Sequence, residues 1–330
     1  MAAPDNTTRG YVVGLGVITA GIFAAMSLAR PDFLTFENLN SMAFQFPEFG
    51  TLALAVLLSM ISGGIDLSVV STANLASIVA AMNMHAEAGS AWAAIPCALV
   101  VGAACGSLNG LLVAFLGLPP ILATLGTMQL FSGIGIVVTR GSSVTGLPDW
   151  FTDFGITSFF EWIPLPTAVF ATVALSTGLL LTFSELGLRA RLLGTNPVAA
   201  RFAGMPVRSV IVKIYALSGV ISSLAGLIVL ARVNSANADY GSSYLLLVIL
   251  INVLAGVSVT GGFGSTTGVV LSVILLQLIS SGLNFMSVSN FARDLLFGAL
   301  LVLVMAGRAA AGFRPIRIPV LWKVRKTWKT

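Results

Sequence analysis

The ionisable side chains of this sequence are too few and too scattered to form a catalytic or metal-binding centre. His85 is the only histidine among 330 residues, and the two cysteines, Cys97 and Cys105, share one apolar run. Zinc sites and activated nucleophiles require several such ligands or bases close together. The sequence also contains no GxxxxGKS or GxxxxGKT motif, the loop with which many ATPases bind phosphate. We therefore expect no catalytic residue, metal or cofactor in this chain, and any ATP that drives it must bind to a partner.

Neutral hydrogen-bonding side chains within or near apolar runs are the more informative polar residues. The candidates for a translocation path are Asn74, Asn109, Thr127, Gln129 and Asn284. Any one of them could simply bond to a neighbouring helix. Together they suit a neutral, hydroxyl-rich solute, because a charged solute more often requires buried charges along its path. No apolar run contains a series of acidic residues, so the sequence shows no proton relay, and Glu48 falls near one end of its run.

Two short turns with paired glycines separate apolar runs. Gly63 and Gly64 follow Ser62, and Gly261 and Gly262 follow Thr260; both pairs precede an apolar residue. Glycine permits the sharp reversals that such turns need. Asp66 lies beside the first pair, where it can cap the following helix; ionisable residues at such positions otherwise mark function. The likeness of the turns suggests an internal duplication, which transporters often contain.

One interior segment, Glu185 to Lys213, is rich in basic residues. Its cations are Arg189, Arg191, Arg201, Arg208 and Lys213. Asn196 is a good helix N-cap, and Pro197 suits the first helical position. Gly204 can adopt the left-handed conformation that ends a helix. The sequence therefore predicts a short helix that includes Ala199, Ala200 and Arg201. The segment could be an ordinary loop or a docking helix for another protein.

The amino-acid composition indicates that membrane-spanning helices hold these polar residues, glycine turns and basic segment in place. The chain is 57% hydrophobic and 9% charged, with a mean hydropathy of +0.98, whereas soluble domains have about 25% charged residues. We expect an all-α, polytopic membrane protein with one domain over residues 1–330, comprising an N-terminus (1–9), a membrane bundle (10–306) and a basic tail (307–330). The expected spans are 11–29, 41–61, 67–84, 92–115, 121–139, 163–183, 214–231, 244–260, 266–283 and 291–306.

The distribution of charge predicts the orientation of this bundle. With ten spans both termini lie on one side, and 13 of the 17 Lys and Arg residues then fall on that side. The positive-inside rule makes it the cytoplasmic side, which includes the predicted short helix between spans six and seven. The formal net charge of +5 therefore reflects membrane orientation, and we expect no nucleic-acid partner.

Several stretches together resemble the permease subunits of bacterial ribose-type ABC importers, a family that includes permeases for simple sugars, polyols and autoinducer-2. They are GGIDLS at 63–68, SLNGLLVAFLGLPPILATLGTM at 107–128, LGTNPVAARFAGMPV at 193–207 and GGFGSTTG at 261–268, with GLN at 282–284. The likeness extends from about residue 10 to about residue 308 and preserves the order of these motifs. This resemblance implies import of a neutral sugar-like solute across the bacterial inner membrane.

The resemblance also implies partners. ABC ATPase subunits would bind on the cytoplasmic side, a periplasmic sugar-binding protein would deliver the solute, and a second permease, identical or not, would complete the pore. In such importers a short cytoplasmic helix couples the permease to the ATPase, and the matching residues here run from Asn196 to Gly204. Two alternatives remain: an ion-coupled secondary transporter, and a membrane enzyme acting on lipid-linked substrates. The first needs coupling groups at mid-membrane, and the second needs an acid, base or metal constellation.

Overall fold

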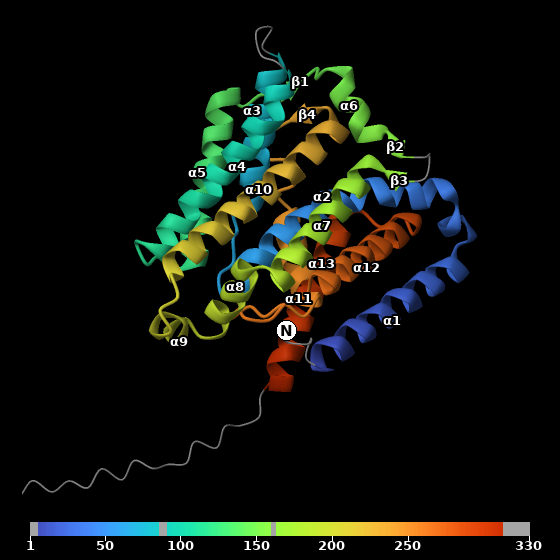
Figure 1. Ribbon diagram of the computed structural model, residues 1–330. Coiled ribbons are helices and arrows are strands. Elements are labelled where there is room, and N and C mark those ends of the chain that lie inside the picture. The colour runs from blue at the N-terminus through green and yellow to red at the C-terminus, as the bar shows by residue number, and fades with distance from the viewer. Residues whose placement is uncertain (1–5, 86–90, 160–162, 313–330) are drawn as a thin grey trace, which may run out of the picture.

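The computed structural model describes residues 6–85, 91–159 and 163–312, and this part of the chain is mostly helical (Figure 1). The principal helices are α1 (Asn6–Ala29), α2 (Phe36–Ile61), α3 (Val69–His85), α4 (Ala91–Ala114), α5 (Pro120–Thr139), α7 (Leu165–Phe183), α10 (Val207–Val233), α11 (Tyr244–Leu254), α12 (Thr266–Phe285) and α13 (Asn290–Gly312). The shorter helices are η1 (Pro31–Leu34), α6 (Asp149–Ile156), α8 (Glu185–Thr195) and α9 (Pro197–Phe202). Two small antiparallel pairs join β1 (Val144–Thr145) to β4 (Ser235–Ala236) and β2 (Ser158–Phe159) to β3 (Ile163–Pro164).

Each of the ten predicted spans corresponds to an apolar helix, and eight helices in the described residues are long enough to cross a membrane. The other two, Val69–Met84 and Tyr244–Leu254, are shorter. The structure thus confirms an all-α polytopic architecture. Helix α11 ends at Leu254, earlier than the predicted Thr260, because Gly256 adopts a φ of +83° and begins a turn. The predicted basic tail lies largely outside the described residues.

The tightest seam of the bundle joins α4 to α10. Gly102, Gly106 and Gly110 recur every fourth residue on α4, so they line one face of that helix. A methyl group on Gly110 would lie 2.7 Å from the Cα of Val212, and one on Gly102 or Gly106 would overlap α10 backbone oxygens. Close backbone approach through small residues is how membrane helices associate without a hydrophobic driving force.

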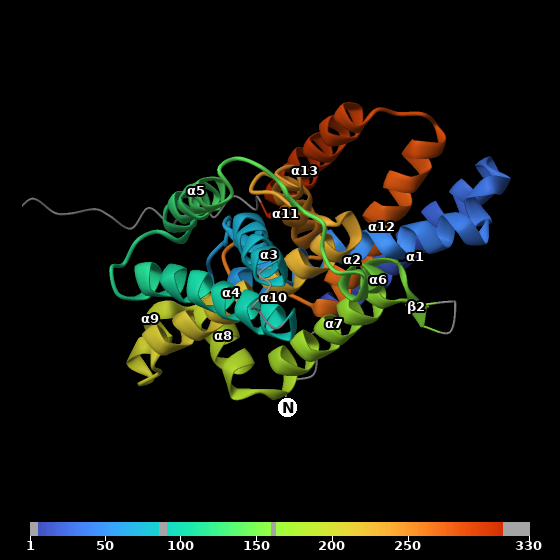
Figure 2. The ribbon, with the colours of Figure 1, turned by 90° about the horizontal axis from the view of Figure 1, so that it is seen from above.

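Helix α2 occupies the middle of the bundle. Its residues from Pro47 to Ile61 are all buried, and it packs against α7, α10, α11 and α12. Figures 1 and 2 place α1 and α5 at opposite margins, and both helices carry many exposed apolar side chains. Such faces suit contact with lipid or another membrane subunit.

Pro47 interrupts the hydrogen-bond ladder of α2. Because proline has no N–H, the carbonyl of Ala43, one turn earlier, cannot receive its usual helical bond. The hydroxyl of Thr167, in the first turn of α7, donates to that carbonyl instead. Neighbouring hydroxyl side chains commonly satisfy the backbone that a proline frees in a membrane helix.

Candidate coupling and transport sites

The basic segment contains the short helix expected from its capping residues. The side-chain oxygen of Asn196 accepts hydrogen bonds from the backbone N–H groups of Val198 (3.1 Å) and Ala199 (2.9 Å), and Pro197 is the first residue of α9. Gly204 adopts a φ of +75° just after the helix. Helix α8, which precedes α9 directly and has Ser184 as its own N-cap, was not predicted. The two helices together form a helical arm at the end of the bundle where α7 ends and α10 begins (Figure 1).

Helix α9 presents an exposed apolar surface. Phe202 is 88% exposed and Val198 is 64% exposed, while Ala199 and Arg201 are also exposed. Ala200 points the other way and is buried. A phenylalanine in contact with water is unfavourable unless another surface covers it. This surface is therefore suited to a protein partner, and its predicted role in ATPase coupling stays a prediction.

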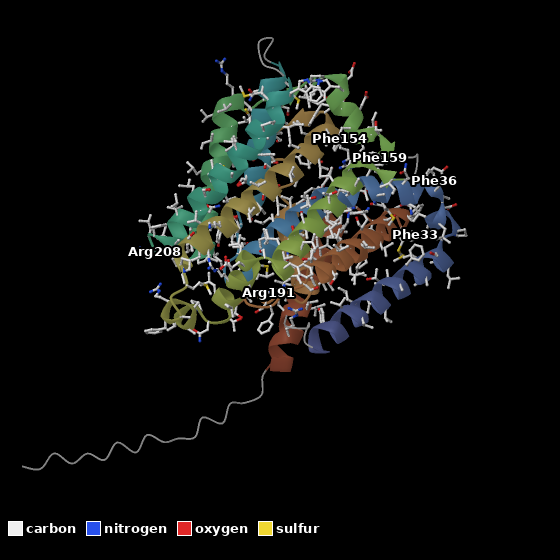
Figure 3. The ribbon with its side chains drawn as sticks, in the orientation of Figure 1. Phe33, Phe36, Phe154, Phe159, Arg191 and Arg208 are labelled. Atoms are coloured by element: carbon white, nitrogen blue, oxygen red, sulfur yellow. The ribbon has the colours of Figure 1, made fainter. Side chains whose placement is uncertain are left out.

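A cation fixes the chain just after α9. The guanidinium of Arg208, at the start of α10, lies 5.3 Å from the centre of the Phe115 ring, next to the end of α4. Arg208 and Arg191, which comes from α8, are both labelled in Figure 3. A guanidinium over an aromatic face is attracted by the ring quadrupole. The cation–π contact therefore holds the first turn of α10, where the chain re-enters the bundle after α9, against the end of α4.

The arm meets the bundle through glycines. Gly63, Gly194, Gly261 and Gly262, here termed the glycine junction, bring the two glycine turns together with the end of α8. A methyl group on Gly261 would lie 2.7 Å from the Cα of Gly63 and 2.8 Å from the Cα of Gly194. The N–H of Gly262 donates to the carbonyl of Ile61, the last residue of α2 (2.9 Å). Three separate segments thus touch through their backbones.

Arg191 strengthens the same contact. From α8 it donates to the carbonyl of Gly264 (3.1 Å), beyond the second glycine turn, and to that of Leu181 in α7 (3.3 Å). Burial lowers the pKa of the guanidinium from its usual range, but an arginine stays charged in proteins. A half-buried cation is stable only where acceptors compensate for lost water, so these bonds hold α8 in place.

Asp66 sits in a buried polar network rather than at the first turn of α3. Its Oδ1 accepts from both the N–H (2.9 Å) and the hydroxyl (2.7 Å) of Ser68. The amide of Asn109 donates to the same hydroxyl (2.7 Å) and accepts from Thr127 (2.5 Å). Asp66 therefore organises the approach to α3, with Ser68 in the position that begins the helix, and joins it to α4 and α5.

The five candidate path residues fall in four different settings. Asn109 and Thr127 belong to the Asp66 network, and the buried amide of Asn74 donates to the carbonyls of Ala238 (2.9 Å) and Tyr240 (2.8 Å). Gln129 is exposed on α5. Asn284 lines a cavity between α2 and α12. The structure therefore does not bring these five side chains together, and their role in translocation stays a prediction.

Two adjoining cavities lie beside α2. The first, of about 210 Å³, is lined by Asn38, Ser41, Met42, Gln45, Gln277, Ser281, Asn284 and Phe285. The second, of about 340 Å³, extends past Gln45 and Gln277 toward α11 and α13. Sequence reasoning missed the contribution of α2. The available signal was the spacing of Asn38, Ser41 and Gln45, which places them on one face of a helix.

An ion pair between a buried carboxylate and a partly exposed arginine borders the second cavity. Glu48 bonds to Arg232 of α10, and Tyr244 of α11 donates to its other oxygen (3.0 Å). The sequence suggested that Glu48 lies near one end of its span. Because α2 begins at Phe36, Glu48 instead lies near the middle of the helix. Its carboxylate is thus satisfied inside the bundle, where an unpaired charge would be costly.

Comparison with known proteins defines the class to which this architecture belongs. Residues 38–305 match the family model described as branched-chain amino acid transport system / permease component, and the chain belongs to this family. This confirms the resemblance to ABC importer permeases. The protein is a multi-pass membrane permease, a translocating subunit rather than an enzyme.

The chain is also similar to individual permeases of this family. The chain is 34% identical over 326 residues to the autoinducer 2 import system permease protein LsrD of Yersinia enterocolitica, with 96% of each chain covered. It is 32% identical to the LsrD protein of Photorhabdus temperata (91% of each chain) and 34% identical to that of Klebsiella pneumoniae (88% of each chain). No solved structure matches the chain.

Proposed function

We propose that this chain is the permease subunit of a binding-protein-dependent ABC importer in a bacterial inner membrane, and that its solute is autoinducer-2 or a similar sugar-like molecule. The observation that carries the proposal is the polar cavity between α2 and α12, in a chain that aligns end to end with autoinducer-2 permeases. Its neutral amides and hydroxyls match the hydroxyl groups of such a solute. Two ATPase subunits, a periplasmic binding protein and a second permease, identical or not, complete the importer.

The family description names branched-chain amino acids, but the first cavity favours a neutral solute. A zwitterionic amino acid needs a free cation and a free anion, because an unpaired ionic group inside the protein is costly. The charged residues that line these cavities all belong to the second one, where Glu48 is paired with Arg232 and Arg293, beside Asp294, donates to the neutral Ser280 (2.6 Å) and Asn290. The first cavity is lined by amides, hydroxyls and apolar groups.

We propose that the helical arm binds the ATPase subunit and transmits its ATP-driven movement to the bundle. In the predicted orientation α9 faces the cytoplasm, where its exposed Phe202 and Val198 would enter a cleft of the ATPase. Movement of α9 passes through α8 to the glycine junction, because Gly194 contacts the backbone of both glycine turns. Helices α2 and α12 flank those turns and also line the solute cavity.

Uptake by right-side-out membrane vesicles loaded with ATP tests the proposal. Vesicles that contain this chain, its cognate permease partner and ATPase are supplied with the cognate binding protein and labelled autoinducer-2. We expect uptake that requires ATP and the binding protein, and none with an ion gradient alone. Uptake driven by a gradient without ATPase would establish the secondary transporter instead. Uptake of labelled leucine but not autoinducer-2 would overturn the assigned solute.

Phe202→Asp should uncouple the ATPase from transport. Phe202 is 88% exposed, so its replacement leaves the permease fold and its thermal unfolding unchanged. A charge in the docking cleft should weaken ATPase binding and reduce uptake by about tenfold or more, as loss of an aromatic anchor does at other interfaces. Co-purification of the ATPase and ATP-driven uptake measure both effects.

Phe202→Leu is the matched control, because it keeps an apolar side chain at this position and should preserve most uptake. Ala199→Glu tests the same exposed surface without disturbing packing. Ala200→Glu is a less clean test, because Ala200 is buried and a charge there also displaces α9. Normal ATPase binding by Phe202→Asp would show that α9 is not the docking element.

A further inference from the structure

We propose that Gln45 and Gln277 form the central hydrogen-bonding pair of a solute-binding site between α2 and α12. The inference rests on the proposed function and goes beyond it by assigning the site and the chemistry of its ligand. That ligand is a small, neutral molecule with several hydroxyl groups and one apolar face.

Two polar stripes face each other across the cleft. On α2, Asn38, Ser41 and Gln45 follow at helical spacing, and on α12 Gln277, Ser281 and Asn284 do the same. The helices run antiparallel here, because Ser281 donates to Asn38 (2.9 Å) while Gln277 lies opposite Gln45. The cleft therefore offers a ladder of neutral donors and acceptors.

The two glutamines retain unused hydrogen-bonding capacity. The amide of Gln45 donates to Ser41 at 2.8 Å, whereas Gln277 donates to Gln45 at 3.4 Å, beyond the usual range for a good N–H···O bond. Each side-chain amide has two donors and an oxygen that accepts two bonds. A hydroxylated ligand can replace the long glutamine contact with shorter bonds at little cost.

The remaining walls suit the carbon skeleton of such a ligand. Met42 and Phe285 line the first cavity, where their apolar surfaces can cover the C–H groups of the solute. The other residues that line this cavity are amides and hydroxyls of α2 and α12. Exposing such polar groups to lipid hydrocarbon has a high free-energy cost. The cavity therefore holds water or solute, and a ligand that displaces water must reproduce the hydrogen bonds of that water.

Gln45 and Gln277 also line the second cavity, so they stand where the two cavities meet. Beyond them lies the Glu48–Arg232 pair, whose charges are already satisfied. The cavities lie in the first half of α2, whereas the glycine junction lies at its other end. In the predicted orientation the site therefore opens toward the side from which a binding protein delivers solute.

The first test replaces each glutamine by leucine in the complete importer. Gln45→Leu and Gln277→Leu should each lower kcat/KM for autoinducer-2 uptake by about tenfold, the effect of one lost ligand hydrogen bond with its buried partner left unpaired. ATP hydrolysis stimulated by the loaded binding protein should persist, because the coupling arm is untouched. Gln45→Asn, which keeps an amide, should recover part of the uptake.

Asn83→Leu is the matched control: among the described residues the amide of Asn83 bonds to Val79 on its own helix, and Asn83 lines neither cavity. Uptake by this variant should equal that of the wild type. Unchanged uptake by both glutamine variants, in folded importers, would overturn the site. A wild-type importer that does not take up autoinducer-2 would instead contradict the proposed function.

The second test does not depend on transport. In a Cys97→Ser, Cys105→Ser background, Gln45→Cys should react with a small, water-soluble thiol reagent, and a saturating concentration of autoinducer-2 should slow the reaction several-fold. Leu175→Cys, 65% exposed on the outer surface of α7, should react slowly because lipid covers it. A Gln45→Cys reaction as slow as that of Leu175→Cys, or one unaffected by the solute, would exclude a solute site.

Discussion

Gly194→Val is expected to detach the helical arm from the bundle and abolish transport. A side chain at this position would overlap the carbonyl oxygen of Ile61 and the nitrogen of Gly262, and neither is the flexible end of a side chain. Either the hydrogen bond from the N–H of Gly262 to the carbonyl of Ile61 must then break, or α8 must move away from the two turns. Overpacking of this kind costs about 3 kcal/mol. Thermal unfolding of the purified permease and ATP-driven uptake measure the loss.

Gly133→Val provides the control for this prediction. Gly133 lies on α5, where an added methyl group would meet no other part of the described structure within 4 Å, so the same change of residue should leave both unfolding and uptake near wild type. A Gly194→Val permease that transports normally would show that the glycine junction does not carry movement from α9. Loss of uptake with unchanged ATPase binding would locate the defect after docking.

Arg232→Met should destabilise the bundle by about 3–5 kcal/mol, because it leaves the carboxylate of Glu48 buried without its ion-pair partner. Tyr244 would remain as one hydrogen-bond donor, which does not replace a full positive charge. The midpoint of thermal unfolding in a mild detergent should fall accordingly, and the amount of protein in the membrane should fall with it.

The double variant Glu48→Gln with Arg232→Met should recover most of that stability. It removes both charges together, and Tyr244 can still donate to the amide oxygen at position 48. The recovery measures the coupling between the two side chains through a double-mutant cycle. Effects of the single and double variants that simply add would mean that the pair contributes no interaction energy.

Features encoded by neighbouring residues were predictable from the sequence. Asn196, Pro197 and Gly204 define α9 through local capping chemistry. The apolar runs located every long helix, although some ends were misplaced: α10 begins at Val207, whereas the predicted span began at Ile214. The end of α11 was misplaced because Val257 and Val259 continue the apolar composition while Gly256 has already turned the chain. Helix α8 was missed because its apolar face is interrupted by two arginines.

Features that depend on distant pairing were not predictable. Glu48 and Arg232 are 184 residues apart, so neither residue alone indicates an ion pair. Both glycine turns were recognised as turns, but nothing local shows that they meet each other and Gly194. The amides of α2 were overlooked for the same reason, since their significance depends on the polar face of α12 opposite them.

The proline in α2 divides that helix mechanically. Gln45 and Ile61 are separated by sixteen residues, or about 24 Å of helix, and Pro47 lies between them. The backbone hydrogen bond that the Ala43 carbonyl lacks is replaced by one from the hydroxyl of Thr167 on α7. Because prolines are the usual sites of helix kinks, we expect α2 to bend most easily at Pro47. If movement of α9 reaches Ile61 through the glycine junction, as proposed, we expect α2 to bend at Pro47. The half of α2 that carries Asn38 and Gln45 would then turn relative to α12 and change the shape of the first cavity.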